Sequence, residues 1–355
     1  MTEYLSSALD LPGAVPPPEG AFDQGVPWHF GDPHAEQRRL IDGTAGVDQS
    51  NLAVVVVSGA DRLSWLHSLT SGWLLDLDAG QSATALVLDP NGHVEFELHA
   101  VDDGERTWLI VGPESAAALV DYLDRMRFLL RVEVADVTDE YAVVWRSDGA
   151  PDRDLVWHVP PEFAGTGATP AGADRGGDAS KYVDERPGRL TGAQVIVPRA
   201  DLLAELGDQP AGSWALEALR VSAGVPRQGS ETDHRTIPHE VGWIGPAVHL
   251  AKGCYRGQET VARVHNMGRP PRRLVLLHLD GSAESLPVHG AGVFVGDRQV
   301  GWVGTAARHF ELGPIATAVV KRNTSDDAAV LVEAPEPGAN RIAATVQPVV
   351  LADPR

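Results

Sequence analysis

The sequence predicts an α+β protein built from more than one structural unit, and three observations lead to this fold class. Apolar and polar residues alternate in many short runs that are separated by Gly or Asn-Gly turns. Between residues 34 and 268 these runs are interleaved with stretches in which apolar residues recur at helical spacing. After Arg272 the pattern consists of strands alone. The chain has 355 residues, too many for one small core, and we expect segment 271–355 to form a small β-barrel.

The composition is that of a globular protein in a reducing compartment. Hydrophobic residues make up 43% of the chain and charged residues 22%, which is ordinary for such a protein. The single cysteine, Cys254, excludes an internal disulfide framework, so we expect the cytoplasm. No apolar run is long enough to cross a bilayer, and the Pro-rich start does not resemble a signal peptide, so no membrane partner is expected. The net charge of −20 argues against general nucleic-acid binding.

The first 147 residues predict an irregular arm followed by a compact α+β unit. Residues 1–33 are rich in Pro and Gly and have little periodicity. Two alternating runs flank Pro90-Asn91-Gly92, a sequence typical of a tight hairpin turn. Asp61 fits the N-cap of a helix, where its side chain would accept hydrogen bonds from free backbone N–H groups. The expected elements are a helix over 34–41, a strand over 51–59, a helix after Asp61, the two hairpin strands, a strand over 106–112, a helix over 114–130 and strands over 132–137 and 141–147.

The second half of the chain begins with a segment that is expected to stay mobile. Residues 164–180 contain no aromatic or large aliphatic side chain, so they cannot bury enough surface to offset the entropy of ordering. The elements expected after it are a strand over 192–198, helices over 200–206, 213–224 and 257–268, and strands over 273–281, 291–307, 315–320, 329–333 and 341–350.

The surroundings of Cys254 give this thiol two interpretations. The predicted helix over 257–268 would place the thiol just before a helix N-terminus, beside Lys252 and Arg256. Partial positive charge and nearby cations stabilise a thiolate, and Gly253 and Gly257 would let the backbone approach a ligand closely. Alternatively, Cys254 is a small buried hydrophobic residue, as lone cysteines commonly are.

Cys254 also lies in a basic island of an acidic protein, opposed only by Glu259. Such an island could hold a small anionic ligand. The alternative, which charge alone favours, is that its side chains pair with acidic neighbours elsewhere in the fold. The island consists of Lys252, Arg256, Arg263, Arg269, Arg272 and Arg273.

The segment KGCYRGQE, Lys252–Glu259, resembles the signature of the YgfZ family, the folate-binding relatives of the glycine-cleavage T-protein (aminomethyltransferase). Three longer segments are similar to other blocks of these proteins. They are LIDGTAGVDQSNLAVVVVSGADRLSWLHSLTS in the N-terminal half, ALEALRVSAGVPRQGSETD with TIPHEVGW before the motif, and VGWVGTAARHFELGPIATAVV in the C-terminal segment. The resemblance therefore covers roughly residues 34–350.

This resemblance implies three domains around a central channel that holds a reduced folate, either tetrahydrofolate or a one-carbon derivative. It also implies a role in the assembly or repair of iron–sulfur enzymes, which would be the client proteins. The implied domains are an irregular N-terminal arm over 1–33, a T-protein-like domain over 34–50 plus 148–270, an inserted α+β domain over 51–147 and a C-terminal β-barrel over 271–355.

The resemblance also implies the site residues. In the family the cysteine and lysine of the motif line the channel, which makes Cys254 and Lys252 the candidate catalytic residues. Neighbouring Trp243, Tyr255 and Trp302 are either apolar walls of the site or ordinary core. The residues expected to bind the cofactor are Glu97, Ser222, Tyr255, Arg256, Gly257, Gln258 and Glu259.

Two positions depart from the T-protein pattern. T-proteins carry, after the Asn-Gly hairpin, an aspartate that acts on the reactive nitrogen of the folate, and Glu97 falls at this position. Strand alternation places Glu97 on one face with Glu95 and His99, and a solvated face is the alternative interpretation. T-proteins also place a glutamate on the pterin in the block that matches LRVSAG, where this chain has Ser222. The histidines at 234, 239, 249 and 265 show no paired ligand spacing, so no metal site is expected.

We therefore predict a folate-binding accessory protein for iron–sulfur enzymes, with Cys254 facing the folate channel. One alternative is a tetrahydrofolate-dependent aminomethyltransferase-like enzyme in which Glu97 accepts a proton. The other is a non-catalytic interaction protein with a vestigial folate site. The sequence leaves open whether the protein turns over a substrate.

Overall fold

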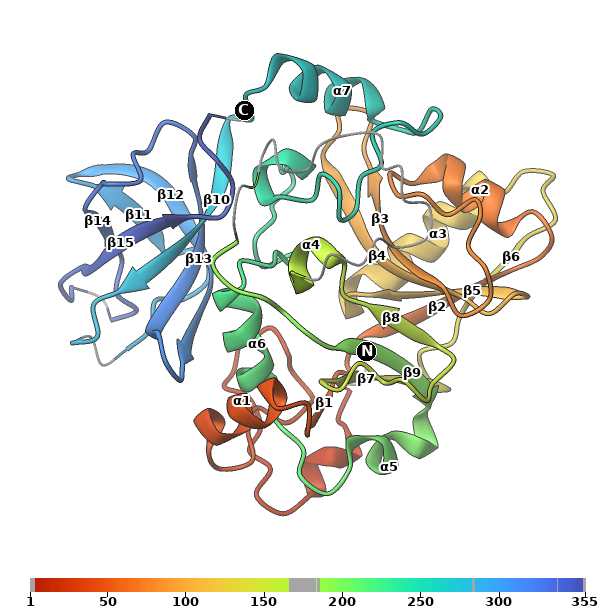
Figure 1. Ribbon diagram of the computed structural model, residues 1–355, viewed down its shortest axis with the longest axis horizontal. Coiled ribbons are helices and arrows are strands. Elements are labelled where there is room, and N and C mark those ends of the chain that lie inside the picture. The colour runs from red at the N-terminus through yellow and green to blue at the C-terminus, as the bar shows by residue number, and fades with distance from the viewer. Residues whose placement is uncertain (1–3, 166–182, 184–185, 283–284, 337, 354–355) are drawn as a thin grey trace.

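The computed structural model describes residues 4–165, 183, 186–282, 285–336 and 338–353. Within them the strands form a five-stranded sheet, a four-stranded sheet and a closed six-stranded barrel. The barrel stands apart at one side of the molecule, and the two open sheets and most helices occupy the rest (Figure 1). The predicted α+β fold class with a C-terminal barrel is confirmed.

The five-stranded sheet has the order β3-β4-β5-β2-β6, and all its neighbouring strands are antiparallel. The predicted hairpin is confirmed, because β3 pairs with β4 across a turn in which Gly92 has a φ of +83°. Helices α2 and α3 bury their apolar residues against Val55, Leu98 and Leu109 of the sheet. The elements are β2 Ala53–Ser58, α2 Arg62–Leu69, β3 Ser82–Leu88, β4 Val94–Asp102, β5 Arg106–Val111, α3 Ala116–Met126 and β6 Glu133–Asp136.

The prediction that Asp61 is the N-cap residue of a helix is correct, but the prediction that its side chain accepts hydrogen bonds from the helix N–H groups is wrong. Asp61 is the N-cap residue of α2, but its side chain makes no capping hydrogen bond. Its carboxylate instead accepts hydrogen bonds from the backbone and guanidinium of Arg131, 2.7 Å from Nη2. A guanidinium with two donors competes successfully with the free N–H groups of the helix.

The four-stranded sheet has the order β1-β7-β9-β8. Strand β7 lies inside the range 51–147 that was assigned to one inserted domain, yet it pairs with β1 and β9 and not with the five-stranded sheet. Where the domains begin and end stays a prediction. The elements of this part are α1 Pro33–Ile41, β1 Gly46–Asp48, β7 Tyr141–Arg146, β8 Val156–His158, α4 Pro161–Ala164, β9 Ala193–Pro198, α5 Leu202–Leu206, α6 Ser213–Ser222 and α7 Gln258–Met267.

The segment predicted to be mobile, 164–180, lies for the most part outside the described residues. Ala164 is the last residue of α4, and Gly165 follows it in a left-handed conformation, with a φ of +65°.

The barrel closes in the order β10-β13-β12-β11-β14-β15. Residues of β10 alternate between two environments, as a strand requires. Val275 and Leu277 lie in the barrel core, whereas Leu274 and Leu276 pack with Ala218 of α6. The outer face of the barrel therefore attaches it to α6. The strands are β10 Arg272–Leu279, β11 Gly292–Val295, β12 Arg298–His309, β13 Gly313–Lys321, β14 Val330–Val332 and β15 Ile342–Pro348.

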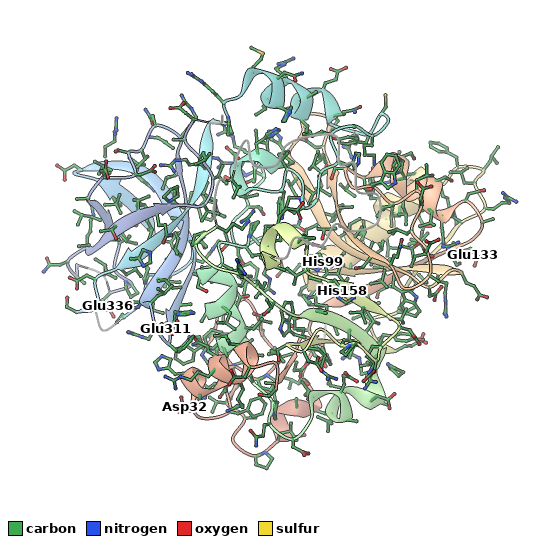
Figure 2. All side chains as sticks on the ribbon, in the orientation of Figure 1. Asp32, His99, Glu133, His158, Glu311 and Glu336 are labelled. Carbon is green, nitrogen blue, oxygen red and sulfur yellow. The ribbon has the colours of Figure 1, made fainter. Side chains whose placement is uncertain are left out.

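The N-terminal arm is irregular, as predicted, but it is fixed to the rest of the fold. Its described part contains one 3₁₀ turn, Ser7–Asp10. Trp28 stacks on Trp214 of α6 with ring centroids 5.6 Å apart. Gly212 lies so close that a Cβ there would sit 2.2 Å from the carbonyl oxygen of Trp28. Figure 2 shows Asp32, which caps α1, at the lower edge of the molecule and His99 near its centre. None of the described helices has the length and apolar character needed to cross a membrane.

Candidate ligand-binding cavity

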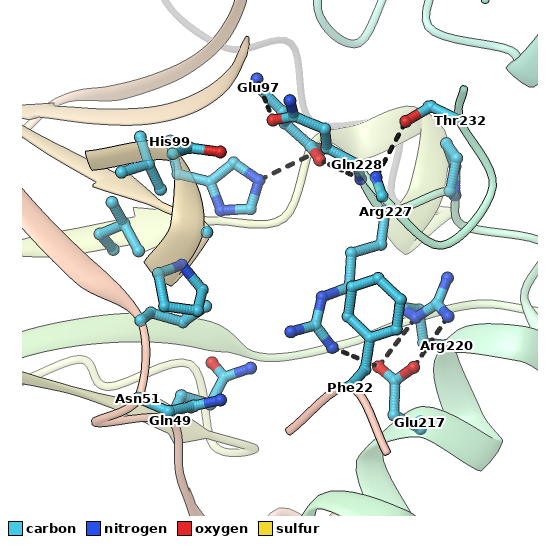
Figure 3. Close-up of a pocket in the computed structure, with 18 of the residues that line it drawn as sticks. Phe22, Gln49, Asn51, Glu97, His99, Glu217, Arg220, Arg227, Gln228 and Thr232 are labelled. Atoms are coloured by element: carbon cyan, nitrogen blue, oxygen red, sulfur yellow. Dashed lines mark hydrogen bonds and ion pairs between the residues drawn. The ribbon is translucent and has the colours of Figure 1, made fainter. Parts of the chain in front are cut away.

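A cavity of about 1120 Å³ lies where the arm, the two open sheets, α6 and the barrel domain meet. Its walls come from segments far apart in the sequence, as the close-up in Figure 3 shows. The arm contributes Phe22, strand β4 contributes Glu97 and His99, α6 contributes Glu217, and the barrel domain contributes His289. Clefts and cavities between structural units are preferred binding places for small molecules.

Space for the cavity exists because strand β4 pairs with β5 over only part of its length and contacts segment 228–236 over the rest. It pairs with β5 only from His99 to Asp102. Over the preceding residues, segment 228–236 takes the place of β5. The backbone N–H of Glu97 donates to Gln228 Oε1 at 2.8 Å, and Gln228 Nε2 donates to the carbonyl of Glu95 at 2.6 Å. The side chain of Gln228 thus satisfies backbone groups that a neighbouring strand would otherwise satisfy.

This arrangement fixes the carboxylate of Glu97 on the cavity wall. Its Oε2 accepts a hydrogen bond from the backbone N–H of Gln228 at 2.9 Å. Its Oε1 lies 3.5 Å from Nε2 of His99, and the side chain of Glu97 is 13% exposed. The predicted cofactor residue Glu97 therefore faces the cavity.

An aromatic and amide wall adjoins Glu97. The imidazole of His99 stacks on Trp157 of β8, with centroids 3.7 Å apart and an interplanar angle of 2°. Nδ1 of His99 lies 2.6 Å from Oε1 of Gln194, whose Nε2 donates to Oε1 of Gln49 at 2.9 Å. The indole N–H of Trp157 donates to Thr84 at 3.1 Å. From the sequence, His99 was predicted only as a strand neighbour of Glu97. The other four residues were not predicted, because no motif links residues so distant in the chain.

The opposite wall carries a buried network of charges. Arg220 of α6 donates to Glu217 at 2.8 Å and to Glu231 at 2.9 Å. Arg227 pairs with Asp23 of the arm at 2.7 Å. Burial disfavours both guanidinium charges, but the neighbouring carboxylates outweigh it, so the pKa of Arg220 and that of Arg227 are raised. The network ties the arm to α6 and leaves these two cations compensated.

The segment Lys252–Glu259 lies outside this cavity. Among the described residues, the lining includes Glu97 but neither Ser222 nor any residue of Lys252–Glu259. Ser222 is the last residue of α6, and its hydroxyl donates to the carbonyl of Leu219 at 2.9 Å. The roles of these residues in binding or catalysis stay predictions.

Lys252 is anchored at the end of α2. Its ammonium donates to the backbone carbonyls of His67, Thr70 and Gly72 at 2.5, 2.5 and 2.7 Å. Nζ also lies 5.3 Å from the ring centroid of Tyr255, which is itself buried. Burial lowers the pKa of Lys252 to about 7. All three donors of this ammonium are thus used by the protein itself, whereas the thiol of Cys254 is exposed.

The rest of the segment is seated on the β3–β4 turn. Arg256 pairs with Glu95 of β4 at 3.0 Å. Gly257 has a φ of +82°, and a Cβ there would lie 2.6 Å from the carbonyl oxygen of Asp89. The predicted helix is confirmed as α7; Gln258 begins it and donates to the carbonyl of Lys252 at 3.4 Å, and Glu259 is exposed in its first turn.

The basic island is largely compensated within the fold, which is the alternative that charge alone favoured. Arg272 pairs with Asp233 and Glu240 at 2.6 and 2.8 Å, and buried Arg273 pairs with Asp326. Arg263 and Arg269 are exposed. Of the three aromatic residues proposed as walls, Trp243 is fully buried in the core, and neither Tyr255 nor Trp302 is among the described residues that line the cavity. The described residues contain no group of three or more His, Cys, Asp or Glu side chains arranged to hold a metal ion.

The fold is similar to that of a known protein structure, and the barrel matches a known family model. The crystal structure of the glycine cleavage system aminomethyltransferase T from Bartonella henselae matches with a TM-score of 0.70 and 18% identity, over 96% of this chain and 94% of that one. Residues 272–353 match the family model of the glycine cleavage T-protein C-terminal barrel domain. The fold is that of an aminomethyltransferase T.

Sequence comparisons agree with this fold. An Arabidopsis thaliana protein named "Putative transferase", chloroplastic, is 29% identical over 296 residues, which are 77% of this chain and 66% of that protein. An aminomethyltransferase of Rubrobacter xylanophilus is 27% identical over 323 residues, 88% of this chain and 86% of that one. These similarities support a relationship to the glycine-cleavage T-protein superfamily; membership of the YgfZ family in particular stays a prediction.

Proposed function

We propose that the cavity binds a reduced folate, tetrahydrofolate or a one-carbon derivative of it, with the carboxylate of Glu97 at the reactive nitrogen of the ligand. The observation that carries this proposal is the position of Glu97, a carboxylate oriented by the Gln228 N–H on the wall of the cavity. The stacked rings of His99 and Trp157 beside it supply an apolar surface for a flat heterocycle. The aminomethyltransferase fold supports the same ligand class.

Calorimetric titration with tetrahydrofolate tests this proposal. We expect the wild-type protein to bind and the Glu97→Ala variant to bind at least tenfold more weakly, because the variant loses a buried charged partner. Glu95→Ala is the matched control, since Glu95 is on the same strand but pairs with Arg256 away from the cavity. No heat of binding from wild-type protein at millimolar tetrahydrofolate would reject the proposal and favour a vestigial site.

We further propose that the folate-bound protein supports the assembly or repair of iron–sulfur enzymes, and that Cys254 serves this role at the protein surface. The thiol is exposed while its neighbour Lys252 is held by three backbone carbonyls. A thiol presented in this way is accessible to a client protein. The reducing environment implied by one free cysteine points to the cytoplasm as the compartment.

The test is complementation in cells whose iron–sulfur enzymes depend on this protein. We expect Cys254→Ala to lose that support while it retains tetrahydrofolate binding in the calorimeter. Full support by Cys254→Ala would exclude a role for the thiol.

The alternative is aminomethyl transfer, which the position of Glu97 keeps open because a carboxylate there can accept a proton. It predicts that ammonia is released from an aminomethyl donor and that this release requires tetrahydrofolate. Absence of release above background, from protein that binds tetrahydrofolate, would reject transfer and leave the accessory role.

A further inference from the structure

We propose that the turn between α3 and β6 is a docking site for another protein. Its apolar tip, which consists of Phe128, Leu129 and Leu130, would insert into an apolar pocket with carboxylates on its rim. That the partner is an iron–sulfur enzyme rests on the proposed function, whereas the docking site itself rests on the exposure, the conformation and the charge of the turn.

The apolar tip is unusual for the surface of a soluble protein. Phe128 is 80% exposed, Leu129 is 100% exposed and Leu130 is 44% exposed. Elsewhere in the described part of the chain, exposed large apolar side chains do not occur three in a row. The turn lies at the end of the molecule opposite the barrel, where Figure 2 labels Glu133 of the neighbouring strand β6. Exposed apolar residues that occur singly need no explanation, but a contiguous group of them marks an interaction surface.

The backbone of the tip is held in an unfavourable conformation. Phe128 has a φ of +46°, and of the described residues other than glycine only Ala150 also has a positive φ. This region is disfavoured for a residue with a bulky side chain. None of the three side chains of the tip is buried, so their packing within the described chain does not compensate for the strain. Strain of this kind is concentrated at functional sites, where a fixed shape is required.

Both ends of the turn are fixed to the N-terminal half of α2. The indole N–H of Trp65 donates to the carbonyl of Met126 at 3.2 Å. On the other side of the tip, the carboxylate of Asp61 accepts from the backbone N–H of Arg131 at 2.9 Å and from its guanidinium at 2.7 Å. Asp61 uses its carboxylate for this contact and does not cap α2. The tip is therefore preorganised, which lowers the entropy that a binding element loses when its partner arrives.

The charges around the tip indicate the chemistry of the partner. Residues 125–131 contain three arginines and no carboxylate, in a protein with a net charge of −20. Arg127 pairs with Asp124 at 3.6 Å, yet its side chain stays 45% exposed. Arg131 stays 76% exposed beside Asp61, and Arg125 is exposed without an ion pair to any described side chain. Aromatic residues and arginines are enriched in protein interfaces, and these arginines match carboxylates on the partner.

A membrane surface can also receive an apolar tip that is flanked by arginines, but two features favour a protein. The elements on either side of the turn carry Asp121 and Asp124 on α3 and Glu133 and Asp136 on β6, and the anionic surface of a bilayer would repel them. In addition, a fluid bilayer requires no fixed shape of the residues that enter it, whereas a preorganised tip suits a pocket of defined shape.

Helix α2 connects the turn to the surface thiol. Asp61 at its N-terminal end holds the turn, and the carbonyl of Thr70 at its C-terminal end accepts a hydrogen bond from Lys252, two residues from Cys254. The eight residues of α2 span about 12 Å (Figure 1). An interface of ordinary size buries about 800 Å² on each partner and extends over a longer distance than this. One client protein can therefore contact both the tip and the thiol.

Photo-crosslinking in cells that make this protein tests the docking site. The photoreactive residue p-benzoylphenylalanine is incorporated at position 129 or, as the control, at position 203 on α5, where Leu203 is 43% exposed. We expect an adduct with one other protein from position 129 and none from position 203. That protein, identified by mass spectrometry and purified, should bind the wild-type chain. Leu129→Asp should bind it at least tenfold more weakly with an unchanged circular dichroism spectrum, and Leu129→Met should retain the affinity.

Four results would each overturn the docking site. They are the absence of a protein adduct at position 129, an adduct with lipid, an adduct with a second copy of this chain, and undiminished binding of the purified partner by Leu129→Asp.

The identity of the partner separates this inference from the proposed function. If the protein in the adduct carries an iron–sulfur cluster, both proposals are supported. If it carries none, the docking site stands and the iron–sulfur role fails. If no protein adduct forms while the wild-type chain supports iron–sulfur enzymes in the same cells, the docking site is rejected and the iron–sulfur role stands.

Discussion

The cavity wall around Glu97 and the segment Lys252–Glu259 both contact strand β4, yet they are held together in different ways. The segment is one continuous stretch anchored by local contacts, with Lys252 on three backbone carbonyls and Arg256 on Glu95. The cavity is assembled from the arm, both sheets, α6 and the barrel domain. A continuous motif can therefore be recognised in the sequence, whereas a cavity that is built from distant segments cannot be predicted from it.

The largest expected effect comes from the buried charge network of the cavity. In Arg220→Met, Glu217 and Glu231 lose a buried counter-ion, and we expect the free energy of unfolding to fall by about 3–5 kcal/mol in urea denaturation. Arg263→Met, which changes an exposed arginine of α7, is the control and should stay within about 0.5 kcal/mol. Equal stability of the two variants would mean that the network contributes nothing net.

Lys252→Met should have the next largest effect and tests whether the segment is a site or an anchor. Removing the ammonium leaves the buried carbonyls of Thr70 and Gly72 and the partly buried carbonyl of His67 without this donor. Each unsatisfied buried group costs about 1–3 kcal/mol. We expect a loss of about 3 kcal/mol in unfolding free energy and a tetrahydrofolate affinity within about threefold of wild type. If a folded variant binds tetrahydrofolate more than tenfold more weakly, the segment Lys252–Glu259 and the cavity belong to one binding site.

Cys254→Ala should change stability by less than about 0.5 kcal/mol, because the thiol is exposed. In the wild-type protein this thiol should react fully with a thiol reagent under native conditions, without prior unfolding. Slow reaction limited by unfolding would show instead that the thiol is protected, which would remove the surface role proposed for it.

A pH dependence is also expected from the anchor of Lys252. Burial first, and then the charges of Lys252 and His249, lower the pKa of His67 to about 4, below its ordinary value of 6.5. Between these two values the unfolded chain binds more protons than the folded one, so stability rises with pH from about 4 to 6.5. His67→Gln should flatten this part of the curve of unfolding free energy against pH, and an unchanged curve would contradict the assignment.

Local patterns of the sequence predicted the fold well. The barrel followed from strand alternation after Arg272, and the β3–β4 hairpin followed from Asn91-Gly92. Both depend on interactions between neighbours in the chain. The side chain of Asp61 was predicted wrongly because Arg131, seventy positions away, competes for it.

The candidate site was predicted only in part, for a related physical reason. Glu97 was found because it lies on a patterned strand next to a recognisable turn. Gln228 replaces the missing backbone partner of β4, and Gln194 fixes the ring of His99, but both contacts exist only once distant segments have packed. Amides carry no charge or reactivity that would mark them in a sequence.

The spread of the cavity walls from Tyr4 to His289 has a consequence for synthesis of the protein. The last wall residue, His289, can reach its place only after the first 289 of the 355 residues have been made and released from the ribosome. A molecule that binds the finished cavity therefore stabilises the assembled state, in which all of its walls are in place. Ligand occupancy would in this way serve as a quality check on newly made protein, since a truncated or misdocked chain would remain empty and open to proteases.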